Sequence, residues 1–275
     1  MIPYIVAAVL LIVFLYILML LPSRAKKDAV SPFTDTFYAH RGLYSEDQTI
    51  AENTLEAFQR ACEKGYGVEM DIRLSKDGQI VVFHDDTLMR AAGIDRPVED
   101  FTWQELSQIP LYGTEARIPL FREVLEVIDG QIPLIIELKT GTQNRKLCED
   151  ACAILRRYKG PYCVESFDPR IIRWFKKNAP EVVRGQLACS VSKAGNGTPR
   201  IVAFLASRCL LNFLSRPNFI AYELVRRKPM SVRLSESLGA LPVCWTSHDP
   251  KDVKGNRLVI FEHYEPPKSF VPGKR

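Results

Sequence analysis

Apolar, strand-like runs alternate with amphipathic, helix-like runs along most of this 275-residue chain, and this alternation limits the possible folds more than any other feature. Strands that alternate with helices indicate a parallel sheet, and about eight such units at this length indicate an α/β protein with a closed (β/α)8 TIM barrel. Strands are predicted at residues 37–40, 68–74, 79–84, 134–139, 162–167, 182–188, 219–224, 242–246 and 258–262. Helices are predicted at residues 120–128, 145–158, 169–178, roughly 199–214, and 232–238.

The strand-like runs are one more than an eight-stranded barrel needs. The stretch Ser75-Lys76-Asp77-Gly78, between the second and third runs, has the composition of a tight turn. Either residues 74–79 form only a bend within one long strand, or one of the runs lies outside the barrel. We favour the bend, because it keeps the ionisable side chains of both runs in one neighbourhood of the barrel rim.

Between Asp85 and Arg117 the alternation loses its regularity, and glycine and proline recur. Long irregular connections in compact domains commonly carry functional loops. Residues 85–117 are therefore predicted to form a small inserted subdomain over the site, within a barrel domain that spans residues 37–275.

The first 22 residues have the properties of a transmembrane helix. Residues 2–21 carry no charge and are almost wholly apolar, and about 20 residues at ~1.5 Å each cross a hydrocarbon core of roughly 30 Å. A cleaved signal peptide is the alternative, but no Lys or Arg precedes the span and no small-residue cleavage pattern ends it. We therefore predict a single-pass anchor at residues 1–22 in the cell membrane, followed by a juxtamembrane linker at residues 23–36.

Charges beside the span predict its orientation. Arg24, Lys26 and Lys27 follow it directly, whereas the terminal amine alone precedes it, so the positive-inside rule places the catalytic domain in the cytoplasm. The seven cysteines are an odd number without paired zinc spacing, which favours reduced thiols in the core and fits that compartment. The net charge of +5 has no dominant basic run beyond this cluster, so nucleic-acid binding is not predicted.

Ionisable residues occur at the downstream ends of successive strand-like runs. They are His40, Arg41, Glu69, Asp71, His84, Glu137 and Lys139. Side chains two apart on a strand point the same way, so Glu69 lies beside Asp71, and Glu137 beside Lys139. Buried carboxylates repel one another and lose hydration, and a hard cation such as Ca²⁺ or Mg²⁺ offsets both effects. The pattern predicts a metal-assisted phosphate site.

Several short motifs occur in a fixed order between residue 37 and about residue 265. They are His40-Arg41-Gly42, Glu52-Asn53-Thr54, Glu69-Met70-Asp71, Asp77-Gly78 followed by Val81-Val82-Phe83-His84-Asp85, Glu137-Leu138-Lys139, Ser166-Phe167-Asp168 and Trp245-Thr246. Any one of them is weak evidence, but their ordered combination is highly specific. In this combination the chain resembles the glycerophosphodiester phosphodiesterase family, a group of (β/α)8 barrels.

The resemblance implies a role for each candidate residue. Glu69, Asp71 and Glu137 would hold one divalent cation, either Ca²⁺ or Mg²⁺. His40 and His84 would form the acid/base pair, and Arg41 and Lys139 would contact the phosphate. Glu52 would support the metal or the glycerol hydroxyls, unless it is only a charge near a helix N-terminus. Trp245 would form an apolar wall for the glycerol carbons, unless it is a core residue.

Three positions depart from the family pattern. Ala51 replaces the Pro that commonly precedes Glu-Asn-Thr, Ser247-His248 stands where Val-Asn is common, and Phe261-Glu262 replaces the usual Thr-Asp. None of them removes a candidate catalytic group, so they bear on the alcohol part of the substrate. His248 and His263 are expected to be polar residues without a catalytic role. Glu165 is expected either in a rim salt bridge or in contact with the substrate or with a metal ligand.

The resemblance implies metal-dependent hydrolysis of glycerophosphodiesters to glycerol 3-phosphate and an alcohol, with two imidazoles that exchange proton-accepting and proton-donating roles. The reaction proceeds either through a cyclic phosphate or by direct attack of water. Because the anchor holds the barrel near lipid headgroups, a lysophospholipid is a second expected substrate. The alternatives are lysophospholipase D or phospholipase C-like activity on membrane lipids, and a non-catalytic lipid-binding membrane protein.

Overall fold

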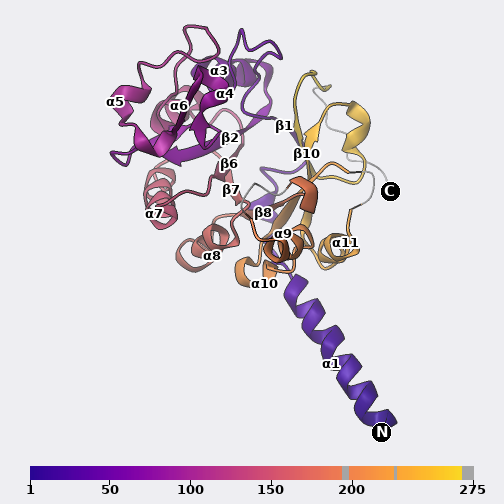
Figure 1. The fold of residues 1–275 in the computed structure, drawn as a ribbon. Helices are drawn as coiled ribbons and strands as arrows, with labels where there is room; N and C mark the ends of the chain where they lie inside the picture. Colours follow the sequence, from indigo (N-terminus) through magenta and orange to yellow (C-terminus); the bar gives the residue numbers. More distant parts are fainter. Residues whose placement is uncertain (194–197, 226–227, 268–275) are drawn as a thin grey trace.

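A parallel barrel forms the centre of the molecule (Figure 1), in a computed structural model that describes residues 1–193, 198–225 and 228–267. Within these ranges eight parallel strands lie side by side, and β1 pairs with both β11 and β2, which closes the barrel. The strands are β1 (Thr36–Ala39), β2 (Gly67–Leu74), β6 (Leu134–Leu138), β7 (Tyr162–Ser166), β8 (Arg184–Ala188), β9 (Phe219–Glu223), β10 (Leu241–Ser247) and β11 (Leu258–Phe261). The predicted TIM barrel is confirmed.

The additional strand-like run lies outside the barrel, so the bend that we favoured was wrong. β3 (Ile80–Val82) pairs antiparallel with the end of β2, with Ile72 opposite Val82. The chain reverses because Gly78 adopts a left-handed φ of 78° and the Ser75 amide donates to the Gln79 carbonyl at 2.9 Å. The hairpin still returns His84 to the level of Asp71, since the Phe83 amide donates to the Asp71 carbonyl at 2.9 Å.

Helices cover the outside of the barrel. They are α3 (Leu55–Lys64), α6 (Phe121–Ile128), α7 (Asn144–Leu155), α8 (Pro169–Asn178), α9 (Arg200–Ser207), α10 (Asn212–Ser215) and α11 (Met230–Ser237), with the 3-10 turns η2 (Val191–Lys193) and η3 (Pro250–Val253). The single helix predicted at 199–214 is wrong. Cys209 takes a left-handed φ of 55°, which ends α9 and starts a new direction at α10.

The segment between Asp85 and Arg117 folds against β3 with its own small sheet. It contains β4 (Thr87–Leu88), α4 (Met89–Ala92), β5 (Ile94–Pro97), η1 (Val98–Asp100) and α5 (Trp103–Leu106). An apolar cluster that includes Val81, Leu88, Phe101 and Leu111 holds it together. In Figure 1 the labels α4 and α5 lie at the opposite side of the molecule from the N-terminus.

The apolar core has two layers, one inside the barrel and one between the strands and the helices. The inner layer includes Tyr38, Ile135, Cys163, Ala221 and Ile260, all almost fully buried. The outer layer joins strand residues such as Val68 to helix residues such as Phe58 and Phe175. All seven cysteines are free and five of them are buried, as predicted for core thiols.

The N-terminal helix α1 (Ile2–Leu20) projects from the barrel (Figure 1). It is long and apolar enough to cross a membrane, by length and composition. Residues 1–15 are exposed, whereas Leu20 is fully buried against the barrel domain. The short helix α2 (Lys27–Val30) lies between α1 and β1.

Candidate active site

Polar residues occupy the inward-facing positions at the carboxyl ends of the barrel strands. Tyr38, Ile135, Cys163, Ala221 and Ile260 belong to the inner apolar layer. Because side chains alternate along a strand, the residues two positions later face the same way. These are His40, Glu137, Glu165, Glu223 and Glu262. The strand ends therefore place one imidazole and four carboxyl groups around the rim of the barrel, together with Glu69 and Asp71 of β2.

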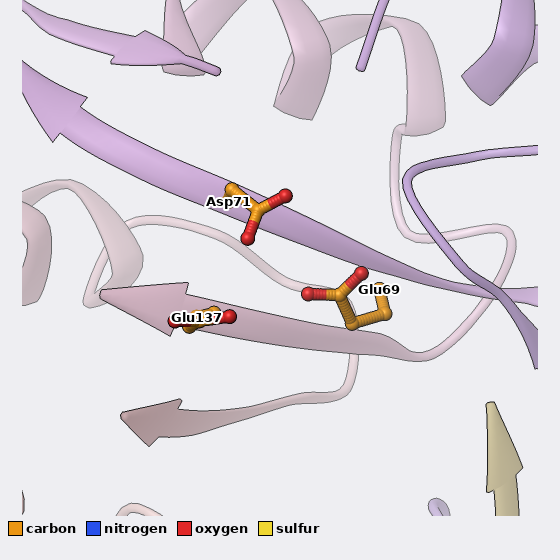
Figure 2. A group of neighbouring side chains, drawn as sticks. All are labelled: Glu69, Asp71 and Glu137. Carbon is orange, nitrogen blue, oxygen red and sulfur yellow. The ribbon is translucent and has the colours of Figure 1, made fainter. Parts of the chain in front are cut away.

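Three of the predicted residues form a compact carboxylate cluster. Glu69 and Asp71 on β2 and Glu137 on β6 each offer an oxygen within 4.8 Å of the others, and all three are buried. Asp71 and Glu137 are register partners on neighbouring strands. Figure 2 shows the carboxyl groups of Glu69 and Asp71 on one strand and that of Glu137 on the next.

The spacing and the chemistry of this cluster fit a hard divalent cation. Two oxygens bound to one Ca²⁺ at about 2.3–2.6 Å can lie as much as ~5 Å apart, which accommodates the observed 4.8 Å. Burial, with the charges of Asp71 and Glu137, raises the pKa of Glu69 well above its usual range. Burial also raises the pKa of Glu137 to about 7. A bound cation offsets both the burial of these carboxylates and the repulsion between them.

Two cationic side chains partly neutralise the cluster. Lys139 Nζ lies 3.0 Å from Glu137 Oε1 and 3.1 Å from Asp71 Oδ1, and it is 9% exposed. Arg41 Nη1 donates to Glu52 Oε1 at 2.9 Å, and its Nε lies 3.7 Å from Asp71 Oδ2. Burial alone would raise the pKa of Asp71, but Lys139, His84 and Arg41 hold that pKa well below its usual range. Asp71 is therefore the ionised member of the cluster.

Asn53 is a site residue that sequence reasoning assigned no role. Thr54 caps helix α3 by accepting a hydrogen bond from the Ala57 amide. This leaves the Asn53 side chain free to turn inward, and its Nδ2 donates to Asp71 Oδ2 at 2.9 Å. Asn53 has a left-handed φ of 55°, a conformation that Asn tolerates better than most residues. The motif Glu52-Asn53-Thr54 thus both starts a helix and orients Asp71.

His40 is held between the cluster and the last strand. Its Nδ1 lies 2.6 Å from Glu262 Oε2, and its Nε2 lies 3.9 Å from Glu69 Oε2. Burial lowers the pKa of His40, although Glu262 acts in the opposite direction. The Nε2 atom therefore faces the carboxylate cluster while Nδ1 is engaged by Glu262.

Glu262 contacts several aromatic side chains besides His40. It accepts a hydrogen bond from Tyr44 at 2.8 Å, and His248 Nε2 lies 3.5 Å from its other oxygen. His263 stacks on His248 with 5.9 Å between ring centres. Burial opposes ionisation of Glu262, but His40 and Tyr44 lower its pKa to about 2. His248 and His263, expected to be polar residues without a catalytic role, thus lie beside Glu262, which in turn contacts His40.

His84 is likewise held by a neighbouring carboxylate. Its Nδ1 lies 2.6 Å from Asp85 Oδ1, and Arg90 connects Asp85 Oδ2 at 2.7 Å to Glu52 Oε1 at 2.6 Å. Burial lowers the pKa of His84, while the charge of Asp71 raises it. Asp71 also raises the pKa of His40, so both imidazoles lie within its electrostatic reach.

The remaining predicted residues lie farther along the rim. Trp245 is half-buried, donates from its indole nitrogen to the Ala221 carbonyl at 3.0 Å, and meets Phe167 edge to face at 5.7 Å. Glu165 is buried next to Glu137, and its Oε2 has no hydrogen-bond partner among the described residues. Burial and the Glu137 charge raise the pKa of Glu165 well above its usual range.

Comparison with known proteins agrees with this geometry. The model of the glycerophosphoryl diester phosphodiesterase family matches residues 40–260, which begin directly after β1 and include the other strands of the barrel except the last residue of β11. The chain belongs to this family.

Curated relatives match about half of the chain. A glycerophosphodiester phosphodiesterase of Caldanaerobacter subterraneus is 34% identical over 160 residues, which cover 54% of this chain and 65% of the relative. The rat protein named Lysophospholipase D GDPD1 is 31% identical over 157 residues, which cover 52% of this chain and 48% of the relative. The alignments thus span less than two thirds of either relative.

Solved structures match over more of the chain. The glycerophosphodiester phosphodiesterase of Thermotoga maritima is 27% identical with a TM-score of 0.61, covering 82% of this chain and 93% of that one. A phosphodiesterase of Oleispira antarctica, described in complex with the product sn-glycerol-3-phosphate, has a TM-score of 0.67 at 23% identity and covers 85% and 94%. This second likeness bears on the fold alone.

Proposed function

We propose that this protein hydrolyses glycerophosphodiesters to glycerol 3-phosphate and an alcohol. The observation that carries the proposal is a buried cluster of three carboxylates at the carboxyl rim of a barrel, with His40 3.9 Å from Glu69 and His84 within the electrostatic reach of Asp71. Membership of the glycerophosphoryl diester phosphodiesterase family supports the reaction class. The names of the Caldanaerobacter and Thermotoga relatives support the same substrate class.

Glu69, Asp71 and Glu137 would hold one divalent cation, either Ca²⁺ or Mg²⁺. Such a cation, when bound, neutralises charge on a non-bridging phosphoryl oxygen. Arg41 and Lys139 border the cluster. Arg41 would bind the phosphate with the parallel N–H donors of its planar guanidinium group, and Lys139 with the compact charge of its ammonium group. Glu52 fixes Arg41 and Arg90, and Trp245 would form an apolar wall for the glycerol carbons.

His40 and His84 would act as the acid/base pair, one accepting a proton from the attacking group and the other donating a proton to the leaving group. Each has its Nδ1 beside a carboxylate, Glu262 or Asp85, which leaves Nε2 as the atom available to the substrate. Burial lowers the pKa of both imidazoles and so favours the neutral form, in which one of them would accept the proton of the attacking hydroxyl or water. The other, in its protonated form, donates a proton to the departing alcohol oxygen. The roles reverse if a cyclic phosphate is then opened by water.

We also propose the organisation inferred from the sequence. Residues 1–22 would form a single-pass anchor in the cell membrane, residues 23–36 a juxtamembrane segment, and residues 37–275 the catalytic barrel with residues 85–117 as an inserted subdomain. Arg24, Lys26 and Lys27 beside α1 support a cytoplasmic barrel. The apolar helix itself supports the anchor by its length and composition.

The test uses the full-length chain purified in detergent. The protein is stripped with a chelator, given Ca²⁺ or Mg²⁺, and supplied with glycerophosphocholine or glycerophosphoethanolamine. We expect cation-dependent release of glycerol 3-phosphate, and its loss in His40→Ala and His84→Ala. Phosphorus NMR of the products separates this cleavage from the phospholipase C-like alternative, which releases a phosphorylated headgroup. Absence of any product from both diesters with both cations would favour a non-catalytic lipid-binding protein.

A lysophospholipase D activity is the second candidate, because the rat relative carries that name. It is the same cleavage with an acyl chain on the glycerol, so the site residues would be unchanged. The two substrate classes differ in location, because glycerophosphodiesters are dissolved in water whereas lysophospholipids are held in a bilayer.

A further inference from the structure

The last turn of α1 is fixed to the barrel domain by buried contacts. Leu20 is fully buried, and its carbonyl accepts a hydrogen bond from Ser235 Oγ of α11 at 2.8 Å. Arg216, directly after α10, donates from Nη1 to the carbonyls of Leu18 and Leu21 at 2.6 and 2.8 Å. These bonds satisfy carbonyls that the end of a helix would otherwise leave unpaired. The direction of α1 relative to the barrel is therefore set by specific contacts.

The residues after α1 continue this attachment at the amino ends of the strands. The Ser23 amide donates to the Pro217 carbonyl at 3.0 Å, and Asn218 Nδ2 donates to the Ser23 carbonyl at 2.9 Å. Arg184, the first residue of β8, donates to Ser23 Oγ at 3.1 Å. Asn218 immediately precedes β9. The helix is thus joined to the amino ends of β8 and β9.

The segment between Ser23 and β1 then closes the same end of the barrel. Phe33 is 5% exposed and belongs to the inner apolar layer, and its carbonyl accepts a hydrogen bond from the Tyr38 hydroxyl at 2.8 Å. Asp35 forms an ion pair at 2.9 Å with Arg257, the residue before β11. The segment is thus attached to the amino end of the barrel through Phe33 and Asp35.

The candidate active site lies at the other end of the barrel. In a parallel barrel all carboxyl ends point the same way, and the carboxylate cluster and His40 lie there. From Asn218 at one end to Glu223 at the other, β9 rises about 16 Å at ~3.3 Å per residue. Strand tilt of about 36° reduces this to roughly 13 Å along the barrel axis. Figure 1 agrees, because α1 leaves the body beside α10 and α11, away from α4 and α5.

We propose that the site receives water-dissolved glycerophosphodiesters, the deacylated forms of phospholipids, and not lysophospholipids held in the bilayer that anchors the protein. The inference rests on the proposed function and on α1 crossing a membrane. A bilayer around α1 borders the amino end of the barrel, so the rim opens toward the aqueous phase. The diester of a lysophospholipid stays in the headgroup layer while its acyl chain remains in the hydrocarbon. To reach the rim, that lipid must first withdraw its chain into water.

The test reconstitutes the full-length protein into phospholipid nanodiscs with Ca²⁺ or Mg²⁺. One sample receives dissolved glycerophosphocholine, and another contains an equal amount of 1-stearoyl lysophosphatidylcholine in the disc, whose long chain exchanges slowly. Choline release is followed in both. We expect at least tenfold faster release from glycerophosphocholine. Equal or faster release from the lipid in the disc would overturn the inference.

A variant with an altered junction separates orientation from headgroup preference. Twenty Gly/Ser residues inserted between Leu21 and Pro22 give a flexible tether with an extension of about 25 Å, enough for the barrel to turn over. We expect release from the lipid in the disc to rise at least fivefold, while release from glycerophosphocholine, which also reports correct folding, stays within twofold of wild type. An unchanged lipid rate in a variant that retains the soluble activity would overturn the inference. Absence of release from every substrate in both proteins would instead refute the proposed function.

Discussion

Replacing Glu137 with Gln should stabilise the ion-free protein by an amount that grows with pH. Burial raises the pKa of Glu137 from 4.5 to about 7, against the opposing effect of Lys139. A carboxyl group with a higher pKa in the folded protein binds more protons when folded, so its contribution to stability is lost as the pH rises through this window. Gln does not titrate. The variant and the wild type should therefore diverge above pH 4.5, and the divergence should be complete above about pH 7.

The size of the effect follows from the structure in two ways. The rise in pKa corresponds to about 3 kcal/mol, at ~1.4 kcal/mol per pKa unit. Two unit charges separated by the 4.8 Å that bounds the cluster repel by about 3.5 kcal/mol at an effective dielectric constant near 20. For a domain of this size 1 kcal/mol moves the Tm by roughly 2–4 °C, so a difference of roughly 6–12 °C is expected at alkaline pH.

The assay is thermal unfolding of the full-length protein in one detergent, followed by circular dichroism with a chelator present from pH 5 to pH 8. Glu165→Gln is the matched control for the effect of the cation, because Glu165 is also a buried carboxyl group with a raised pKa but lies outside the cluster. A divalent cation at about 100 times its Kd should add about 2.7 kcal/mol to the wild type and to the control, and much less to Glu137→Gln. A difference between Glu137→Gln and wild type that does not change with pH, or equal stabilisation of both by the cation, would refute the reasoning.

Three further variants test separate parts of the structure. His84→Asn should lower kcat by about 10²–10⁴-fold with an unchanged Tm, and a loss below tenfold would contradict an acid/base role. Glu262→Gln removes the carboxylate that raises the pKa of His40, so the His40 limb of the kcat/KM profile should move to lower pH, with partial recovery in Glu262→Asp. An unmoved profile would mean that Glu262 is only structural. Leu155→Ala, at a site 1% exposed in the outer apolar layer, should cost about 2–5 kcal/mol of unfolding free energy while kcat is unchanged; a loss below 1 kcal/mol would show that the cavity collapses.

The barrel could be predicted from the sequence because its signals are local. Each strand is a short apolar run, and the inward positions change from apolar to ionisable at the carboxyl end, as in Ile135 and Glu137. This change identifies the rim without knowledge of the strand order. The same rule, applied to the last strands, would have drawn attention to Glu223 and would have marked Glu262, noted only as a departure from the family pattern, as a residue of the rim.

The errors arose where distant contacts decide the structure. The direction of the chain after Gly78 depends on a turn that can either bend or reverse a strand, and composition alone does not distinguish these outcomes. The break at Cys209 replaces a helix that the apolar pattern favoured. Arg90 connects Asp85 to Glu52 from a segment whose irregular sequence carries no periodic signal, so its place beside the site was not predictable.

The attachment of α1 to the barrel also affects how the protein would fit a bilayer. The helix has 19 residues, but the barrel domain partly covers it after residue 15, which leaves about 21 Å of exposed helix at ~1.5 Å per residue. A hydrocarbon core of roughly 30 Å is thicker than this, so a hydrophobic mismatch arises. One response is local thinning of the bilayer around the helix. The other is that the amino end of the barrel enters the headgroup layer, at a place where Phe213 on α10 is 42% exposed. Membrane thickness would then select where in a cell this protein accumulates.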